Sequence, residues 1–320
     1  MKRILLMYSN GSPSTRHIAN LRTLAPDLEP SVAKSEIEAL QFAPEAKAII
    51  GQRFLAQVVP IARTLEWVQS SGGGYDHIPF QRLADQGVRL CRFTGPSQVV
   101  AQHAVALFLA LARGIPGIVA AQGEKKWARD GLWAVLSAPR RALVLGNGSI
   151  GARVVTALAA LGLEVDVLHG GSNPPEASEA NRVHVGNSWM EDLDQIDVVV
   201  NCLPLNEGTR GIVSSEVISL LRPGAFFVNV GRFETVDVES LVGALKSGGI
   251  AGAALDVFPG RDALSSESSL WNTPNLIISP YVASLYCSRG EDFERFVESQ
   301  VERWVRGEPL LDLIEPGRQK

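Results

Sequence analysis

The stretch "ALVLGNGSIGARVVTALAALG", residues 142–162, decides the fold of this chain. An apolar run ends at Gly146, and Gly148 and Gly151 complete the spacing G-x-G-x-x-G. After the first glycines, apolar residues recur at helical spacing and share one helix face: Ile150, Val154, Leu158 and Leu161. The stretch therefore predicts a strand, a tight glycine turn and a helix, in this order.

A strand, glycine turn and helix in this order predict a dinucleotide-binding site. Gly146 permits the tight turn, Gly148 lets the backbone approach a pyrophosphate, and Gly151 lets the helix pack on the strand. The N-terminus of the helix offers free N–H groups and partial positive charge to the phosphates. We expect Ser149 and Ile150, inside the same turn, to contact the cofactor too. A glycine-rich structural turn without a ligand is the alternative.

The next strand, "LEVDVLHGGSN" at residues 163–173, bears on the choice between NAD and NADP. A strand at this place ordinarily ends in an acid that binds the adenosine ribose hydroxyls. Here Asp166 lies within the strand, and His169 takes the tip as a cofactor contact. No Arg follows that would attract a 2′-phosphate. We therefore expect NAD or NADP as the cofactor, without a preference between them.

The rest of the chain predicts an α/β fold with two Rossmann-like, doubly wound parallel-sheet domains and a cleft between them. Its 320 residues suffice for about two domains. Apolar strand-like runs such as "RILLMYS" and "AKAIIGQ" alternate with helix-period segments, as parallel α/β sheets require. The longest helical pattern, residues 99–115, is apolar nearly all round and is expected to be buried between domains or against a second subunit.

Composition excludes several classes of function. A net charge of −4 without a long basic run argues against nucleic acid and against a membrane surface as partner. No apolar stretch reaches the ~18 residues of a membrane span, and the apolar run in "MKRILLMYS" is too short for a signal peptide. The three cysteines lack metal-type spacing, so we expect no metal and a reduced, cytoplasmic chain.

Four further segments carry a resemblance to a known family. They are "SSGGGYDHIPF", "VVVNCLPLNEGTRGIV", "LLRPGAFFVNVGRFETVDVESLVGALKSGGIAGAALDVF" and "WVRGEPLLDLI". With the glycine turn, they resemble the D-isomer-specific 2-hydroxyacid dehydrogenases over nearly the whole chain, and the third segment is the most specific match. The resemblance implies a substrate (catalytic) domain, residues 1–98 plus 285–320, and an inserted dinucleotide-binding domain, residues 99–284. It also implies a homodimer formed largely through the inserted domain.

The resemblance also implies the chemistry: an NAD(P)-dependent oxidoreductase acting on the CH–OH group of a small 2-hydroxy acid, or reducing the 2-oxo acid. Members of the family use an Arg after "NVG", a His after "SP" and a Glu shortly after "LDVF". Arg232 matches the first and would bind the carboxylate and the carbonyl. Tyr281 replaces the His, and Arg261 replaces the Glu. Because a guanidinium stabilises a phenolate, Tyr281 with Arg261 or Arg232 is predicted to form a proton relay.

Other site residues follow from the same resemblance. Consecutive glycines let backbone N–H groups converge on an anion, so the loop after residue 70 is predicted to bind the substrate, although a flexible turn is the alternative. Asp256 matches the acid that in the family lies near the nicotinamide carboxamide. The predicted substrate contacts are Ser71, Gly72, Gly73, Gly74, Tyr75 and His77. The further predicted cofactor contacts are Leu203, Pro204, Val230, Gly231 and Asp256.

The paired loss of His and Glu leaves a second function open. It also fits a catalytically silent dinucleotide-binding protein of the same fold, with a regulatory or partner-binding role. Phe233 favours this reading, because the family usually has Gly after the Arg. The remaining histidines offer no replacement: His103 is expected to pack in the core, whereas His17 and His184 are expected at the surface.

Overall fold

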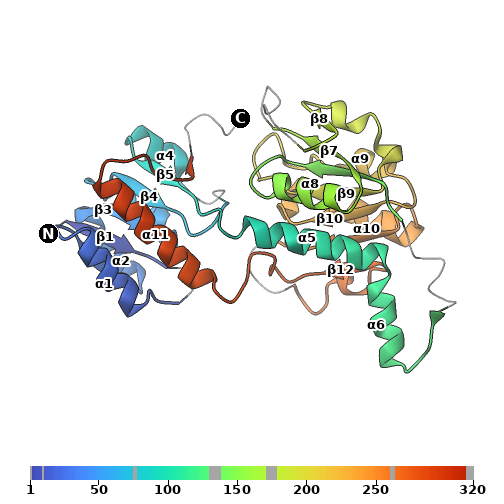
Figure 1. Ribbon diagram of the computed structural model, residues 1–320, viewed down its shortest axis with the longest axis horizontal. Helices are drawn as coiled ribbons and strands as arrows, with labels where there is room; N and C mark the ends of the chain where they lie inside the picture. The colour runs from blue at the N-terminus through green and yellow to red at the C-terminus, as the bar shows by residue number, and fades with distance from the viewer. Residues whose placement is uncertain are drawn as a thin grey trace. The chain divides into compact units, whose positions relative to one another are not determined.

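The computed structural model of the protein describes residues 2–8, 11–74, 78–129, 138–170, 179–259 and 264–314 (Figure 1). The chain forms two compact units. Unit 1 comprises Met1–Pro96 and Tyr286–Lys320, and unit 2 comprises Ser97–Leu285. Each unit is built around one mostly parallel sheet with helices on both faces. The predicted α/β class with two doubly wound sheets is therefore confirmed.

The described residues of unit 1 form a six-stranded sheet and the helices that connect its strands. In chain order its elements are β1 (Arg3–Leu6), α1 (Thr15–Leu24), β2 (Glu29–Val32), α2 (Glu36–Phe42), the 3-10 turn η1 (Ala43–Glu45), β3 (Ala46–Ile50), α3 (Leu55–Val58), β4 (Trp67–Gln69), α4 (Phe80–Asp85), β5 (Arg89–Cys91), α11 (Arg289–Val305) and β13 (Leu313–Ile314).

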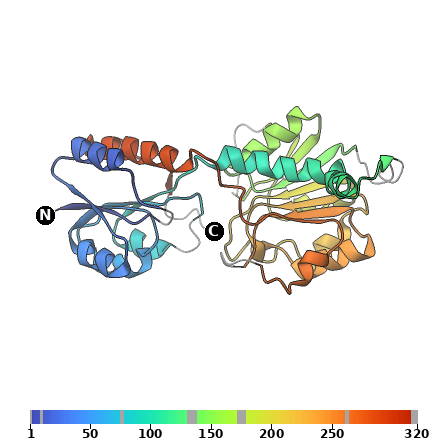
Figure 2. The same cartoon turned by 90° about the horizontal axis from the view of Figure 1, so that it is seen from below.

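The sheet of unit 1 has the order β13-β5-β4-β3-β1-β2, parallel except for β13. Alternation along the strands serves both faces: Ile4 and Leu6 pack toward α1 and α11, whereas Leu5 packs toward α2, α3 and α4. Figure 2 shows α1 and α11, in blue and red, side by side on one face of this sheet. The chain reverses its direction of winding between β1 and β3, and such a switch point is where ligands bind in open α/β sheets.

The sequence pattern did not predict β2, the edge strand of unit 1. Its residues "EPSV" include a proline and two polar residues, so they lack the apolar alternation of an inner strand. A proline is tolerated at an edge, because there its missing N–H removes no ladder hydrogen bond. Pairing with β1 therefore makes this segment a strand, and that long-range contact leaves little trace in the local sequence.

The described residues of unit 2 form a seven-stranded sheet. In chain order its elements are α5 (Ser97–Ala112), α6 (Ile115–Gly123), β6 (Arg141–Leu145), α8 (Gly151–Ala160), β7 (Glu164–Leu168), β8 (Arg182–His184), η3 (Ser188–Met190), η4 (Leu193–Gln195), β9 (Val198–Asn201), α9 (Ser215–Leu220), β10 (Phe226–Asn229), η5 (Phe233–Thr235), α10 (Val238–Ser247), β11 (Gly252–Leu255), η6 (Ser269–Asn272) and β12 (Leu276–Ile278).

The sheet of unit 2 is wholly parallel, with the order β12-β11-β10-β9-β6-β7-β8. Helices cover both faces: α5 and α8 pack on one, and α9 and α10 on the other (Figures 1 and 2). The inner strands are apolar nearly throughout, as expected for strands covered on both sides. The switch in strand order lies between β6 and β9, directly after the glycine turn.

The apolar helix predicted over residues 99–115 ends three residues early in the structure, and a second helix follows it. Helix α5 ends at Ala112, Gly114 adopts a left-handed conformation with φ +62°, and α6 begins at Ile115 with Pro116 in its first turn. No residue of α6 is buried. Among the described residues, no single helix is long and apolar enough to cross a membrane, although the pair α5 and α6, bent by 66°, reaches that length and composition together.

Candidate functional site

Five neighbouring strands of unit 2, β6, β9, β10, β11 and β12, end in a level row of paired residues. Leu145 pairs with Asn201, Asn201 with Asn229, Asn229 with Leu255, and Leu255 with Ile278. The residues that follow this row are called here the carboxyl edge: Gly146, Cys202, Val230, Asp256 and Ser279. The level register therefore brings residues that lie far apart in the sequence, among them the predicted Gly146, Val230 and Asp256, to one edge next to the switch point where a ligand is expected.

The glycine turn after β6 has the geometry that a bound pyrophosphate needs. Gly146 has φ +100°, and a Cβ there would lie 3.3 Å from Leu203 Cδ2. A Cβ on Gly151 would lie 1.7 Å from the Gly146 carbonyl oxygen, so the helix closes tightly on the turn. A Cβ on Gly148 would meet nothing within 4 Å. The turn is therefore packed on its protein side and open at Gly148, which fits a ligand approaching the backbone there.

The other predicted residues of the turn lie at the start of α8. Ile150 directly precedes Gly151, the first residue of that helix. The Ser149 hydroxyl lies 3.0 Å from the hydroxyl of Ser97, the first residue of α5. This turn is therefore attached to α5 as well as to the sheet.

Two buried asparagines hold the loops after β9 and β10, and they were not predicted. The Asn201 side-chain amide donates to Asn229 Oδ1 at 3.1 Å and to Thr235 Oγ1 at 2.7 Å. In return, Asn201 Oδ1 accepts the N–H of Leu203, and Asn229 Oδ1 accepts the N–H of Gly231. The signal was an Asn at the end of each apolar run, "VVVN" and "FFVN". A buried amide needs partners, so these residues fix both loops.

Arg232 is the third residue after β10, in the loop where the sequence predicted it. Its backbone carbonyl accepts hydrogen bonds from Asn229 Nδ2 at 3.0 Å and from Thr235 Oγ1 at 2.6 Å. Its guanidinium donates to the Gly231 carbonyl at 2.8 Å, and the side chain is half-buried. Gly231 admits no side chain, because a Cβ there would lie 2.7 Å from the Leu203 carbonyl oxygen. The backbone at Arg232 is thus held rigidly at the carboxyl end of β10.

Asp256 is a buried acceptor for the segment that follows β12. Only 3% of the residue is exposed. Its carboxylate accepts a short hydrogen bond from the Ser279 hydroxyl, and the backbone N–H groups of Val282 and Ala283 at 3.0 and 3.1 Å. These bonds enclose residues 279–283, the segment that contains Tyr281. The acid therefore fixes this segment from inside the unit.

Tyr281 occupies a backbone conformation that few side chains adopt. Its φ is +59°, and its N–H donates to the Ser279 carbonyl at 2.9 Å. The residue is 44% exposed, and no described residue hydrogen-bonds its hydroxyl. A positive φ at a bulky residue is strained, and the bonds from Asp256 help to hold it in place. Arg261, the predicted partner, lies outside the described residues.

The acid of the following strand serves the structure instead of a ribose. Asp166 of β7 is buried, and its carboxylate lies 3.3 Å from Arg141 Nη2 and 3.8 Å from Arg182 Nε. His184 of β8 lies 3.8 Å from the same oxygen and is mostly buried, so its predicted place at the surface was wrong. His169 follows β7, where the sequence placed it, and its N–H donates to the His184 carbonyl.

The predicted substrate loop follows β4 in unit 1. Phe93 N–H donates to the Gly72 carbonyl at 3.1 Å, and Arg289 Nη2 donates to the Ser71 carbonyl at 3.2 Å. A Cβ on Gly72 would meet nothing within 4 Å, and one on Gly73 would only touch the Phe93 carbonyl at 3.8 Å. The loop is therefore anchored through carbonyl groups and through the Gly72 N–H, which donates to Ser70 Oγ at 3.3 Å. Gly74 ends its described part, since Tyr75 and His77 lie outside the described residues.

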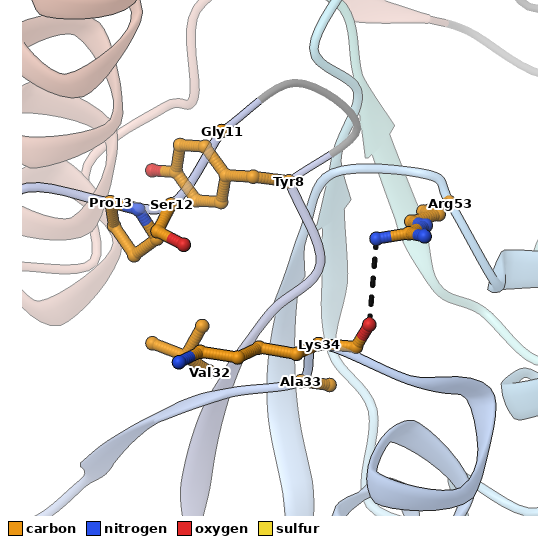
Figure 3. A pocket seen from close by; sticks show the side chains of 8 residues that line it. All are labelled: Tyr8, Gly11, Ser12, Pro13, Val32, Ala33, Lys34 and Arg53. Atoms are coloured by element: carbon orange, nitrogen blue, oxygen red, sulfur yellow. Dashed lines mark hydrogen bonds between the residues drawn. The ribbon is translucent and has the colours of Figure 1, made fainter.

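Unit 1 also has a pocket of about 300 Å³ at the carboxyl ends of β1, β2 and β3. Figure 3 shows two cations in its wall, Lys34 and Arg53, and the Arg53 guanidinium donates to the Lys34 carbonyl at 3.5 Å. The pocket borders the switch point between β1 and β3, a place suited to a small anion. Its full lining is Tyr8, Gly11, Ser12, Pro13, Val32, Ala33, Lys34 and Arg53.

Two other histidines differ from their expected places. His17 is fully buried, with Nδ1 2.7 Å from Glu298 Oε1 and Nε2 2.9 Å from the Tyr8 hydroxyl. The prediction of a surface residue was wrong because α1 packs on α11, which brings Glu298 over it. Burial, with the nearby carboxylates, raises the pKa of Tyr8. His103 was expected to pack in the core, but its side chain is 27% exposed and contacts Ser279.

In the described part of the chain, no group of three or more His, Cys, Asp or Glu residues is placed to hold a metal ion.

Comparisons with known proteins place these features in a family. The family model described as "D-isomer specific 2-hydroxyacid dehydrogenase, NAD binding domain" matches residues 105–283, more than half of the chain. A D-3-phosphoglycerate dehydrogenase of Archaeoglobus fulgidus is 27% identical over 90% of this chain and 55% of its own length. The chain spans about half the length of such relatives.

Two further relatives match over most of both chains. A glyoxylate reductase of Pyrococcus furiosus is 27% identical over 81% of this chain and 79% of its own. A solved D-isomer specific 2-hydroxyacid dehydrogenase of Xanthobacter autotrophicus, in complex with NADPH and MES, is 28% identical, covers 100% of both chains and superposes with a TM-score of 0.77. The chain thus belongs to the D-isomer specific 2-hydroxyacid dehydrogenase family, residues 105–283 correspond to its NAD-binding domain, and its cofactor is NAD or NADP.

Proposed function

We propose that the protein is an oxidoreductase that exchanges hydride between NAD(P) and a small 2-oxo or 2-hydroxy acid. One observation supports this above the others. The level carboxyl edge of unit 2 brings together the open glycine turn, Arg232, Asp256 and the segment of Tyr281. Relatives named glyoxylate reductase and hydroxypyruvate reductase support a small 2-oxo acid as the substrate.

Residues of the carboxyl edge and the glycine turn would hold the cofactor. Gly148 leaves room for the pyrophosphate, and the N-terminus of α8 adds N–H donors and partial positive charge. When bound, the nicotinamide supplies or accepts the hydride. The further contacts that we propose are Gly146, Ser149, Ile150, Gly151, His169, Leu203, Pro204, Val230, Gly231 and Asp256.

Arg232 would bind the substrate carboxylate and polarise the carbonyl to be reduced. A guanidinium presents planar paired donors that match a carboxylate, and it stays charged at any working pH. A cation fixed beside the carbonyl stabilises the negative charge that develops on oxygen. The hydrogen bonds from Asn229 and Thr235 to the Arg232 backbone would keep this cation in place during the reaction.

Tyr281 would donate the proton to the new hydroxyl. A phenol is neutral at pH 7 and therefore acts as a donor, which favours reduction of a 2-oxo acid over the reverse reaction. The 44% exposure of Tyr281 and the hydrogen bonds to Asp256 that hold the adjacent backbone support this role. Arg261 is proposed as the cation that stabilises the phenolate left behind.

Unit 1 would supply the rest of the substrate site. Backbone N–H groups of the loop at Ser71, Gly72, Gly73 and Gly74 are proposed to bind the acid, with Tyr75 and His77 beside them. We propose residues 1–98 plus 285–320 as the substrate domain and residues 99–284 as the dinucleotide-binding domain. We further propose that the protein is cytoplasmic and has neither nucleic acid nor a membrane as partner.

A homodimer is supported by the surface of α6. Ile115, Ile118 and Val119 are exposed there, and Val119 is 60% exposed. A helix whose apolar side chains lie in water is costly for a monomer, so a second copy would cover it. The resemblance to the family favours the same region as the dimer contact.

The first prediction separates packing from cofactor binding at two glycines. Gly148→Ala adds a Cβ into open space, so stability should stay near wild type while NADH affinity falls about tenfold or more. Gly151→Ala forces a Cβ against the Gly146 carbonyl, so unfolding should become easier by about 1–3 kcal/mol. Urea unfolding and titration calorimetry with NADH measure the two effects. Gly243→Ala, on α10 with open space around it, is the control. Unchanged affinity in Gly148→Ala would contradict the proposed phosphate site.

The second prediction tests the reaction through the fall in nicotinamide absorbance with a panel of 2-oxo acids. Wild type should oxidise NADH or NADPH, and Arg232→Ala should abolish turnover. Tyr281→Phe should lower kcat about 10²–10⁴-fold with a smaller change in KM, as expected on removing a general acid. Tyr286→Phe is the matched control.

The same assay contains the result that favours the other function. If wild type binds the reduced cofactor tightly but turns over no acid of the panel, the protein is a silent dinucleotide-binding module. If Tyr281→Phe keeps full turnover, Tyr281 is not the acid.

The third prediction concerns α6. Val119→Glu should convert the protein from twice to once the chain mass of 34.4 kDa in light scattering, because a charge would be buried in the proposed contact. Ile37→Glu, on α2 of unit 1 at a residue that is 79% exposed, should leave the dimer intact. A monomeric wild type, or a dimer that tolerates Val119→Glu, would refute this interface.

A further inference from the structure

We propose that His103 of α5 is a positioning residue for Tyr281, acting through Ser279 and Asp256. The inference rests on the proposed function for its kinetic consequence only. His103 Nε2 lies 2.8 Å from Ser279 Oγ and 3.5 Å from Asp256 Oδ1. The three side chains come from α5 and from the loops after β11 and β12. They form one connected group inside unit 2.

The chemistry of the three groups sets the direction of each hydrogen bond. An ionised carboxylate only accepts, and a serine hydroxyl has a single proton to give. Ser279 must therefore donate to Asp256, and its oxygen must accept from His103. It follows that His103 Nε2 carries a hydrogen in this structure. No described residue hydrogen-bonds Nδ1, and the side chain is 27% exposed.

This order matters because Asp256 also holds the backbone around Tyr281. Its carboxylate accepts the N–H groups of Val282 and Ala283, directly after the strained residue. If His103 no longer donated to Ser279, the hydroxyl would lose the bond that orients its proton toward Asp256. The change would weaken the network in which the Asp256 carboxylate accepts the N–H groups of Val282 and Ala283. Residues 281–283 would become less firmly held.

The position on α5 explains why a histidine suits this role. Ala104 and Phe108 are fully buried and hold the helix against the sheet of unit 2. The His103 ring extends from that fixed helix to the loop after β12, which a shorter donor would not reach. Position 281 is a tyrosine, so the imidazole that contacts Ser279 and Asp256 at this edge is that of His103. Its ring contacts protein groups, and it is not assigned a step of the reaction.

Two variants test the proposal. His103→Gln keeps an N–H donor at the distance of Nε2, whereas His103→Leu keeps the volume and removes the donor. Amide hydrogen exchange of Val282 and Ala283 in the cofactor-free protein reports how firmly Asp256 holds them. We expect about tenfold faster exchange in His103→Leu and in Ser279→Ala, and near wild-type exchange in His103→Gln. The imidazole nitrogen shifts of His103 should show the hydrogen on Nε2, and a hydrogen on Nδ1 alone would contradict the inferred direction of the bond to Ser279.

A double-mutant cycle then tests whether the hydrogen bonds from His103 through Ser279 to Asp256 affect turnover through Tyr281. His103→Leu should lower kcat about tenfold with little change in KM, and His103→Gln should restore most of it. In a Tyr281→Phe background, His103→Leu should cost almost nothing further, because its effect passes through the tyrosine. A purely structural loss would add in full to the Tyr281 variant and would overturn the proposal.

The exchange experiment keeps the proposal independent of the proposed reaction. If wild type has no turnover, the proposed function fails, and the exchange rates of Val282 and Ala283 still test whether His103 supports their hydrogen bonds to Asp256. Unchanged exchange of both amides in a folded His103→Leu protein overturns the proposal, whatever the kinetics. If His103→Leu does not fold, the same comparison is made with Ser279→Ala, which removes the bridging hydroxyl.

Discussion

The level ending of the parallel strands in unit 2 is the constraint on which the site depends. Register pairs Leu145, Asn201, Asn229, Leu255 and Ile278 across five strands, so the next residue of each strand emerges at one edge. Because side chains alternate between faces, a slip of one residue would exchange the side chains that pack toward α5 and α8 with those that pack toward α9 and α10. The burial of both faces thus protects the register, and the register places the chemistry.

Buried polar groups then give this edge its rigidity. Asn201, Asn229 and Asp256 are each almost fully enclosed, and each uses its oxygen to accept N–H groups of a loop. An unpaired buried amide or carboxylate is costly, so the loops keep the conformations that satisfy them. Arg232 and Tyr281 stand on these loops. A reactive side chain on a rigid backbone needs less reorganisation when a substrate binds.

Local patterns in the sequence predicted much of the fold, but not its long-range contacts. The spacing of Gly146, Gly148 and Gly151 requires only neighbours along the chain, and the structure places all three in the expected turn. The sequence did not predict strand β2, because pairing with β1 rather than apolar periodicity defines it. It did not predict α6 as a separate helix either, because the apolar side chains of α6 are not buried. His17 was misplaced because its burial comes from α11, far away in sequence.

The site shows the same division. The family resemblance placed Arg232 and Asp256, and their loops do lie at the carboxyl edge of unit 2. No local signal revealed that His103 would meet Ser279, because 176 positions separate them in the sequence. Asn201 and Asn229 lie at the ends of apolar runs, where a buried polar side chain needs a hydrogen-bond partner. The sequence did not show which residues these partners are, because they lie on the neighbouring strand and its loop.

The central claim, that this edge supports hydride transfer, is tested most directly by isotope transfer. The protein would be incubated with NADH or NADPH carrying deuterium at the transferable position of the nicotinamide, together with small 2-oxo acids. Mass spectrometry of the products would then locate the label. The account predicts a 2-hydroxy acid with one deuterium bonded to C2. Tight binding of the labelled cofactor with no deuterated product from any acid would contradict it.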